Sequence, residues 1–172
     1  MILNNYLVGS PVMSGRDGVR ARVRRGFILG IIITALFLPL SLSPFGEAFA
    51  LEFRAYGYVI YKSGEVIHVG YLPLYLYMWR VSSLLFLAWI ITYIAYIIKP
   101  SIVLDSSGIV YGTFYVVTHY VYLFTIGAPV IIYPLTYELI TVGKPLLYLD
   151  WGQVIALVTI WRFYVIRRLM RG

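Results

Sequence analysis

The chain has 172 residues and a formal net charge of +7, yet 61% of its residues are hydrophobic and only 12% are charged. Soluble globular domains carry about 25% charged residues, so the composition excludes an ordinary water-exposed surface and predicts one membrane-embedded domain. The absence of cysteine excludes disulfides, thiolate metal sites and cysteine nucleophiles.

The first predicted element is a hydrophobic helix that follows a basic segment. Residues 1–25 contain a cluster of arginines, and residues 26–46 contain no charged side chain. About 20 apolar residues can cross the hydrocarbon core of a membrane, so we expect a first transmembrane helix at 26–44, ending near Pro39 and Pro44. A cleaved signal peptide is disfavoured, because the basic segment is long and no clear cleavage site follows the apolar run. The clustered arginines are Arg16, Arg20, Arg22, Arg24 and Arg25.

After this helix, residues 51–72 have the pattern of an extracytoplasmic β-hairpin. Ser63-Gly64 suits a two-residue turn, which would place Ile60 opposite Ile67. Both faces of such a hairpin are apolar. Because an isolated two-stranded hairpin is marginally stable in water, we expect it to lie on the membrane, on a later outer loop or on another subunit.

Three more transmembrane helices are predicted in the remainder of the chain. Residues 81–98 and 108–127 are uncharged and long enough to span. The span at 146–166 is the weakest of the four, because any window of sufficient length includes Asp150 or Arg162. We therefore predict that this last helix either is short or has one charge below the membrane interface.

The predicted fold class is an all-α membrane protein with four transmembrane helices and a small extracytoplasmic β-hairpin between the first two. Residues 1–25 form a basic cytoplasmic segment, and residues 26–172 form the four-span membrane domain. An alternative is open for residues 102–149, which are rich in Val, Ile, Tyr, Phe and Thr and would also suit a cytoplasmic β domain. Against it, alternating polarity is missing over this stretch.

The cations are distributed unevenly around the predicted spans. A cytoplasmic N-terminus places ten of the 14 Lys and Arg residues on the cytoplasmic side, and four with five acids on the other. Because such an excess orients membrane helices, we expect a multi-pass protein of the cell membrane with both termini cytoplasmic. The arginine cluster is then a topology anchor that also attracts anionic lipids. Nucleic acid is not an expected partner, since the basic run is short and no aromatic nucleic-acid module accompanies it.

Three ionisable residues lie inside or beside predicted spans, where they are candidates for function: His119, Asp150 and Arg162. His119 could bind a cofactor, relay a proton or bond a quinone carbonyl, but the predicted spans hold no second histidine for two-histidine haem ligation. Asp150 and Arg162 are about 18 Å apart along a helix, so we do not expect them to pair. The helix dipole alone can explain Asp150 at a helix N-terminus. Asp105 is interpreted as an ordinary turn residue.

Small residues recur at four-residue spacing in two of the predicted spans. Such faces let two helix backbones approach closely, and the partner helix could belong to this chain or to another. These helix-packing candidates are Gly26, Gly30, Thr34, Gly108 and Gly112.

No catalytic motif is present, so we do not expect an enzyme, and neither a metal site nor a cofactor is predicted. We expect an accessory or structural subunit of a larger membrane complex, with a respiratory or redox assembly as one conceivable host. Its partners would be the lipid bilayer and other membrane subunits. One alternative is an oligomeric transporter or channel component in which Asp150, His119 and Arg162 line a polar pathway. Another is a lipid- or quinone-binding redox protein that uses His119. The scarcity of Asn and Gln is typical of proteins from thermophiles.

Overall fold

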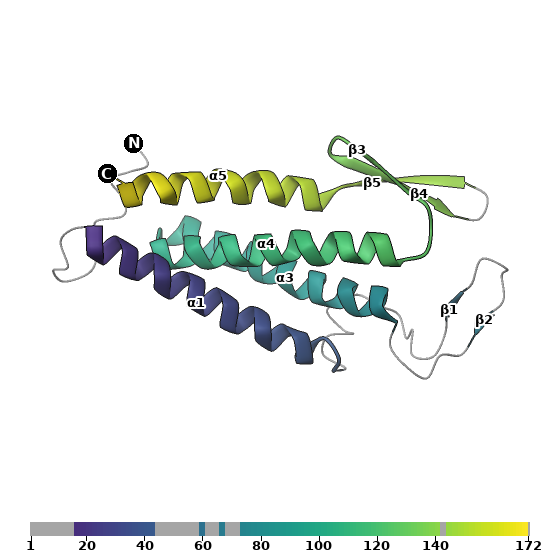
Figure 1. Ribbon diagram of the computed structural model, residues 1–172, viewed down its shortest axis with the longest axis horizontal. Coiled ribbons are helices and arrows are strands. Elements are labelled where there is room, and N and C mark those ends of the chain that lie inside the picture. Colours follow the sequence, from purple (N-terminus) through teal and green to yellow (C-terminus); the bar gives the residue numbers. More distant parts are fainter. Residues whose placement is uncertain (1–15, 44–58, 61–65, 68–72, 142–143, 172) are drawn as a thin grey trace.

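The computed structural model describes residues 16–43, 59–60, 66–67, 73–141 and 144–171. This described part is mostly helical, with four long helices that lie side by side and two small groups of strands at one end (Figure 1). The helices are α1 (Arg16–Leu40), α3 (Leu74–Ile98), α4 (Ile102–Thr125) and α5 (Trp151–Arg171). Successive helices run in opposite directions, so the start of α1 and the end of α5 lie at the same end of the bundle. We call this end the terminal end and the opposite one the sheet end.

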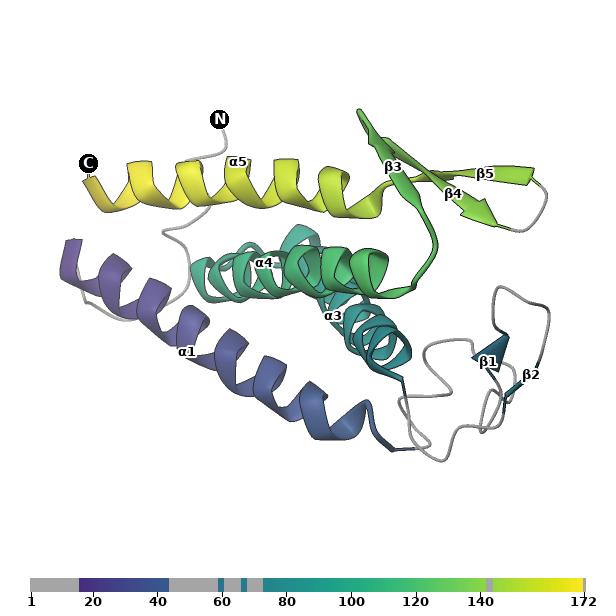
Figure 2. The same cartoon turned by 45° about the vertical axis from the view of Figure 1, so that its right-hand side comes forward.

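Helix α4 is the central element of the bundle, since it packs against each of the other three helices (Figure 2). Two apolar clusters form the core around it. The cluster toward the terminal end consists of Val23, Ile102, Ile109 and Ile166. The second consists of Val81, Leu85, Tyr111, Tyr115 and Ile155.

Two of the described helices are long and apolar enough to cross a membrane by length and composition, namely Asp17–Leu40 and Leu74–Ile98. Most of their apolar surface is exposed, and only 22% and 28% of their most apolar windows are buried within the chain. Ile97 and Ile98, for example, are 78% and 79% exposed. A membrane location is therefore possible, since hydrocarbon would cover these side chains without a penalty.

The four helices differ from their predicted bounds mainly at their starts. Helix α1 includes the arginine cluster and ends at Leu40, directly after Pro39. Helix α3 begins at Leu74, after Pro73, several residues before the predicted start of the second span. The prediction of helix at 146–149 is wrong, because these residues belong to a strand and α5 begins at Trp151.

The substantial sheet lies between α4 and α5 and not between the first two helices, which corrects the predicted fold. It is antiparallel with strand order β3-β4-β5, formed by β3 (Val130–Tyr133), β4 (Thr136–Thr141) and β5 (Lys144–Leu149). The β-domain alternative is thus wrong for Ile102–Thr125, which is helix, although strands do follow it.

The predicted hairpin at 51–72 is described only at two short strands, β1 (Val59–Ile60) and β2 (Val66–Ile67). Ile60 pairs with Val66 and not with Ile67, so the predicted register is wrong by one residue. The proposed Ser63-Gly64 turn lies outside the described residues. A one-residue shift exchanges the faces on which one strand's side chains lie, so the predicted face assignments do not hold.

Candidate functional site

The interface between α4 and α5 holds two pairs of ionisable residues at opposite ends. Because the helices are antiparallel, Asp105 near the start of α4 meets Arg162 in the second half of α5. At the sheet end, His119 in the second half of α4 meets Asp150, which immediately precedes α5. The three candidates from the sequence thus lie along one interface, but in two separate clusters.

The pair at the terminal end is a closed ion pair. Arg162 donates from Nε to Asp105 Oδ1 at 2.7 Å and from Nη2 to Asp105 Oδ2 at 2.5 Å. The carboxylate is fully buried and Arg162 is 5% exposed. The guanidinium also lies over the ring of Tyr96, with 4.5 Å between Cζ and the ring centroid. A two-pronged Arg–carboxylate pair fixes orientation as well as charge, so its most direct effect is to hold α4 against α5.

The pair at the sheet end is less completely satisfied. Nε2 of His119 lies 3.3 Å from Oδ1 of Asp150, at ion-pair distance but outside hydrogen-bond geometry. Asp150 is fully buried and accepts three hydrogen bonds, from Tyr120 Oη at 2.9 Å, from Gln153 Nε2 at 2.9 Å and from the Gln153 backbone N–H at 3.2 Å. These donors hold the carboxylate in place. The imidazole beside it therefore keeps a ring nitrogen without a hydrogen-bond partner.

Gln153 ties this cluster to the sheet. Its side chain donates to Tyr133 O at 2.7 Å and accepts from the backbone N–H of Leu135 at 2.8 Å. Leu135 has a positive φ of 62°, which is costly for a residue with a Cβ, so this turn needs such support. The backbone N–H of Asp150 also donates to Leu135 O at 2.9 Å. The β3–β4 turn and the start of α5 are consequently one hydrogen-bonded unit.

Next to this unit is a pocket of about 270 Å³ whose wall is largely aromatic. His119 is part of the wall, and three tyrosine rings surround its imidazole. Tyr115 stacks on it at 5.4 Å, while Tyr120 and Tyr137 meet it edge-on at 5.5 and 6.2 Å between centroids. The lining residues come from α3, α4, β4, β5 and the start of α5: Trp79, Ser82, Ser83, Phe86, Tyr115, His119, Tyr122, Tyr137, Leu149 and Trp151.

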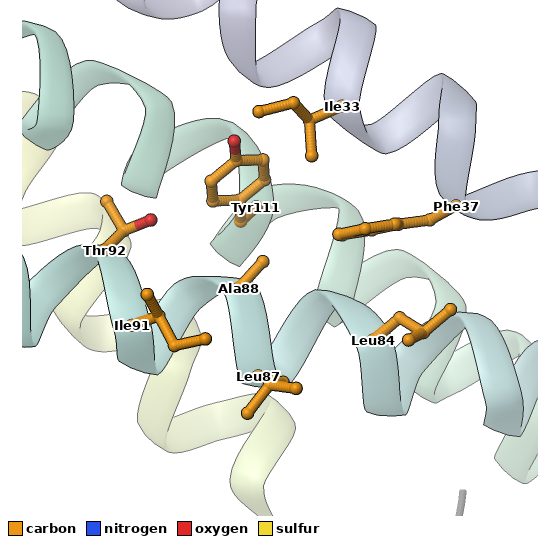
Figure 3. A pocket seen from close by; sticks show the side chains of 8 residues that line it. All are labelled: Ile33, Phe37, Leu84, Leu87, Ala88, Ile91, Thr92 and Tyr111. Atoms are coloured by element: carbon orange, nitrogen blue, oxygen red, sulfur yellow. The ribbon is translucent and has the colours of Figure 1, made fainter. Parts of the chain in front are cut away.

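A second pocket, of about 340 Å³, lies between α1 and α3 and is almost wholly apolar (Figure 3). Ile33 and Phe37 of α1 face Ala88 and Leu84 of α3 across it, and Tyr111 of α4 closes one side. This groove has no ionisable group other than the Tyr111 phenol. It therefore provides an apolar counterpart to the aromatic pocket around His119.

Between the two pairs of ionisable residues, three buried polar atoms lack a hydrogen-bond partner: Trp89 Nε1, Tyr93 Oη and Thr159 Oγ1. Gly112 brings two of them together, since a Cβ at this position would touch both Thr159 Oγ1 and Trp89 Nε1. The Trp89 and Tyr93 rings are 4.8 Å apart. Buried groups of this kind are normally bonded to protein or to internal water, so the interior between the two pairs is polar.

The small residues singled out from the sequence lie mostly at contacts within this chain. A Cβ on Gly26 would lie 2.5 Å from Val103 O, and one on Gly30 would lie 2.8 Å from Val110 Cβ, so α1 packs closely on α4 at both. Gly108 faces the ring of Tyr93 on α3, and Gly112 faces α5. Thr34 is buried, with its hydroxyl unpartnered.

The arginine cluster forms the first turns of α1 at the terminal end. Arg20, Arg24 and Arg25 are exposed, and Arg22 bonds the backbone oxygen of Gly18 at 3.3 Å. The basic last turn of α5, with Arg168 and Arg171, lies at the same end. Much of the chain's positive charge is therefore collected there.

Two residues of the site were not found from the sequence. Asp105 was interpreted as a turn residue, whereas it is a fully buried helix residue and the partner of Arg162. Gln153 is the only glutamine of the chain and bonds both Asp150 and the β3–β4 turn. Asp105 and Gln153 could have been found from the sequence as polar residues within otherwise apolar stretches. Among the described residues, no group of three or more His, Asp or Glu side chains could hold a metal ion.

Comparisons of the chain with protein-family models, with curated proteins and with solved structures give no match.

Proposed function

We propose that the chain is a non-catalytic integral membrane protein that serves as a subunit of a larger membrane complex. The observation that carries this proposal is the sheet β3–β5, which stands outside the helix bundle and exposes large apolar side chains on both faces. The exposed residues of one face include Ile131, Leu147 and Leu149, and those of the other include Ile132 and Leu146. Apolar sheet faces need a cover, because water disfavours such patches.

The sheet itself suits a protein partner better than it suits lipid. Within the part of the chain that the structure describes, each outer strand pairs with a neighbour on one side only, and hydrocarbon cannot satisfy backbone groups on an open side. Leu147, opposite Glu138 in the register, is 67% exposed, which is the highest exposure among the large apolar residues of the sheet. A neighbouring subunit would cover both the apolar side chains and an open strand edge.

In this proposal all four helices cross the membrane, and the terminal end is cytoplasmic. Helices α4 and α5 contain Asp105, His119 and Arg162, but these side chains lie at the α4–α5 interface and not on the exposed surface. The exposed arginines of α5 lie in its last turns, at the terminal end. The exposed face of α5 is apolar, with Leu157 and Ile160 61% and 67% exposed. The arginines at the terminal end fit the cytoplasmic excess of positive charge.

Single cysteines can test both parts of the proposal, because the native chain has none. In native membranes, a photocrosslinker on Leu147→Cys should trap one distinct membrane protein, whereas the same reagent on Leu157→Cys, at the exposed face of α5, should trap lipid. In membranes where the chain is expressed alone, an impermeant maleimide added outside should label Leu147→Cys and not Lys99→Cys. Self-crosslinks alone at position 147 would contradict the subunit role.

A second candidate function, a component of a proton or ion pathway, is favoured by the unpartnered atoms of Trp89, Tyr93 and Thr159 between the two pairs of ionisable residues. Such a path would join Asp150 and His119 at one end to Arg162 at the other. Purified chain in liposomes separates the two functions. A pathway gives a proton flux that Asp150→Asn lowers, whereas a purely structural subunit gives none.

A further inference from the structure

The aromatic pocket at the sheet end combines three features that are not found together elsewhere in the described residues. It has a nearly continuous aromatic wall, a volume of about 270 Å³ and a buried imidazole with a fixed carboxylate behind it. Sites for drug-sized ligands usually measure roughly 300–1,000 Å³, so this one fits a single ring system and not a whole lipid. Planar rings are the ligands that aromatic walls hold best, through stacked and edge-on contacts.

The orientation of His119 determines which ring edge is available to a ligand. A Cβ on Gly152 of α5 would lie 2.6 Å from Cδ2 of His119, and Nε2 points to Asp150. The Cδ2–Nε2 edge thus faces α5. The opposite edge, which carries Nδ1, points away from α5, and His119 is one of the residues that line the pocket.

The carboxylate of Asp150 allows Nδ1 of His119 to act either as a hydrogen-bond acceptor or as a donor. With a proton on Nε2 and the carboxylate beside it, neutral His119 presents Nδ1 as an acceptor; when protonated, it presents Nδ1–H as a donor. A hydroxyl of a hydroquinone matches the first state, and a carbonyl of a quinone matches the second. Ser82 and Ser83, which also line the pocket, could offer further lone pairs, because their own hydroxyl protons go to Thr118 Oγ1 and Trp79 O.

We infer that this pocket binds the headgroup of a quinone or hydroquinone, with His119 as the hydrogen-bonding residue and Trp79, Phe86 and Trp151 among the rings around it. The site lies within one chain, so this inference does not depend on the proposed subunit role. The apolar groove between α1 and α3 has no comparable polar group and serves as the natural control.

The test is a titration of the purified full-length chain in detergent with menadione, a soluble naphthoquinone, followed by quenching of tryptophan fluorescence. Two tryptophans, Trp79 and Trp151, line the pocket, whereas Trp89 and Trp161 do not. Saturable quenching is expected in the wild type. It should be lost in the double variant Trp79→Phe/Trp151→Phe and kept in Trp89→Phe/Trp161→Phe.

Three substitutions then locate the site. Ser83→Phe fills the pocket without touching the Ser82–Thr118 bond, and His119→Phe keeps the ring but removes the nitrogen; each should weaken binding at least about tenfold. Ala88→Phe fills the apolar groove of Figure 3 and should leave binding unchanged. Equal affinity in Ser83→Phe, loss in Ala88→Phe alone, or quenching that never saturates in the wild type would each overturn the inference.

The tryptophan pairs keep the inference testable if Ser83→Phe does not fold, because each of them replaces one aromatic ring by another. A failure of menadione binding would leave the crosslinking results at Leu147 unaffected. Conversely, a chain that binds menadione but has no partner would refute the subunit role alone.

Discussion

At the terminal end of the α4–α5 interface, Asp105 and Arg162 satisfy each other through two short hydrogen bonds, and both are buried. At the sheet end, Asp150 is equally buried but is held by three neutral donors, beside an imidazole whose Nε2 lacks a hydrogen bond. The first arrangement is complete in itself. The second places beside the buried carboxylate an imidazole that also lines a pocket.

The two pairs therefore have different expected roles within one interface: the Asp105–Arg162 pair is structural, and the His119–Asp150 pair is a candidate for function. A closed Arg–carboxylate pair joins two buried charges through charge-assisted hydrogen bonds, and its removal should affect folding above all. A His–Asp pair beside an aromatic pocket can change its proton arrangement with little loss of packing, because histidine is stable in neutral and charged forms. The terminal end therefore holds the bundle together, and the sheet end is where recognition is expected.

The largest expected effect comes from opening the closed pair. Asp105→Ala leaves the Arg162 guanidinium buried without its counter-charge, which should lower the free energy of unfolding by about 3–5 kcal/mol. Thermal unfolding of the purified chain in detergent, followed by circular dichroism, measures this effect.

The double variant Asp105→Leu/Arg162→Met is the matched control. It removes both charges and keeps the side chains bulky, so it should recover most of the stability lost in Asp105→Ala. A loss of only about 0–1 kcal/mol in Asp105→Ala, which is the contribution of an exposed ion pair, would show that the Asp105–Arg162 pair does not hold α4 against α5.

Substitution of one glycine at each end of the bundle tests how much close helix packing contributes to stability there. In Gly26→Ala the new Cβ meets the backbone oxygen of Val103, which cannot move alone, so α1 must shift and stability should fall by about 1–3 kcal/mol. In Gly152→Ala the Cβ meets side-chain atoms of His119 and Asp150 and not the backbone of another helix, so the loss should be smaller. Denaturation of both variants under the same conditions tests the order, and a larger loss at position 152 would reverse it.

A smaller effect on stability is expected for Asp150→Asn. The substitution conserves shape, and His119 can stay neutral, so the loss should be about 1–2 kcal/mol, well below that of Asp105→Ala. The comparison with Asp105→Asn is decisive, because both substitutions change one carboxylate to an amide. Equal losses would show that the two ends do not differ in kind.

The smallest effect concerns Tyr137, which closes the pocket from β4. Burial raises the pKa of its phenol from 10 to about 12. Because the folded chain keeps this proton above the pH at which the unfolded chain releases it, Tyr137 stabilises the fold below pH 10 and loses that contribution as the pH rises to about 12. The fall in melting temperature between pH 10 and 12 should therefore be slightly shallower in Tyr137→Phe, and an identical slope would place this phenol in water.

Helices α1, α3 and α4 could be predicted because each contains a long run of uncharged residues, which is a local feature of the sequence. The uncharged run of α5 is short, and its prediction was the weakest. The start of α5 could not be predicted, since the Asp150 backbone N–H bonds the oxygen of Leu135, in a turn much earlier in the chain, where β5 ends and α5 begins. Residues 144–149 pair fully with β4, and this pairing overrides the helical pattern.

The candidate site was predictable only as a set of residue types. His119, Asp150 and Arg162 stood out as ionisable groups in apolar surroundings, but their partners depend on how α4 and α5 align. Asp105 and Arg162 are 57 positions apart, and no periodicity connects them. Asp105 also sits among serines and a glycine, which favour a turn in isolation, although their hydroxyls bond backbone oxygens of the preceding helical turn.

The most direct test of the proposed subunit role is to isolate the chain from gently solubilised native membranes and determine the mass and composition of the intact complex. We expect partner subunits in fixed stoichiometry for the wild type and for Leu146→Lys, and their loss in Leu147→Lys, whose new cation can pair with Glu138 and so preserve the sheet. A wild-type chain that is recovered alone or as a homo-oligomer would contradict the proposed role.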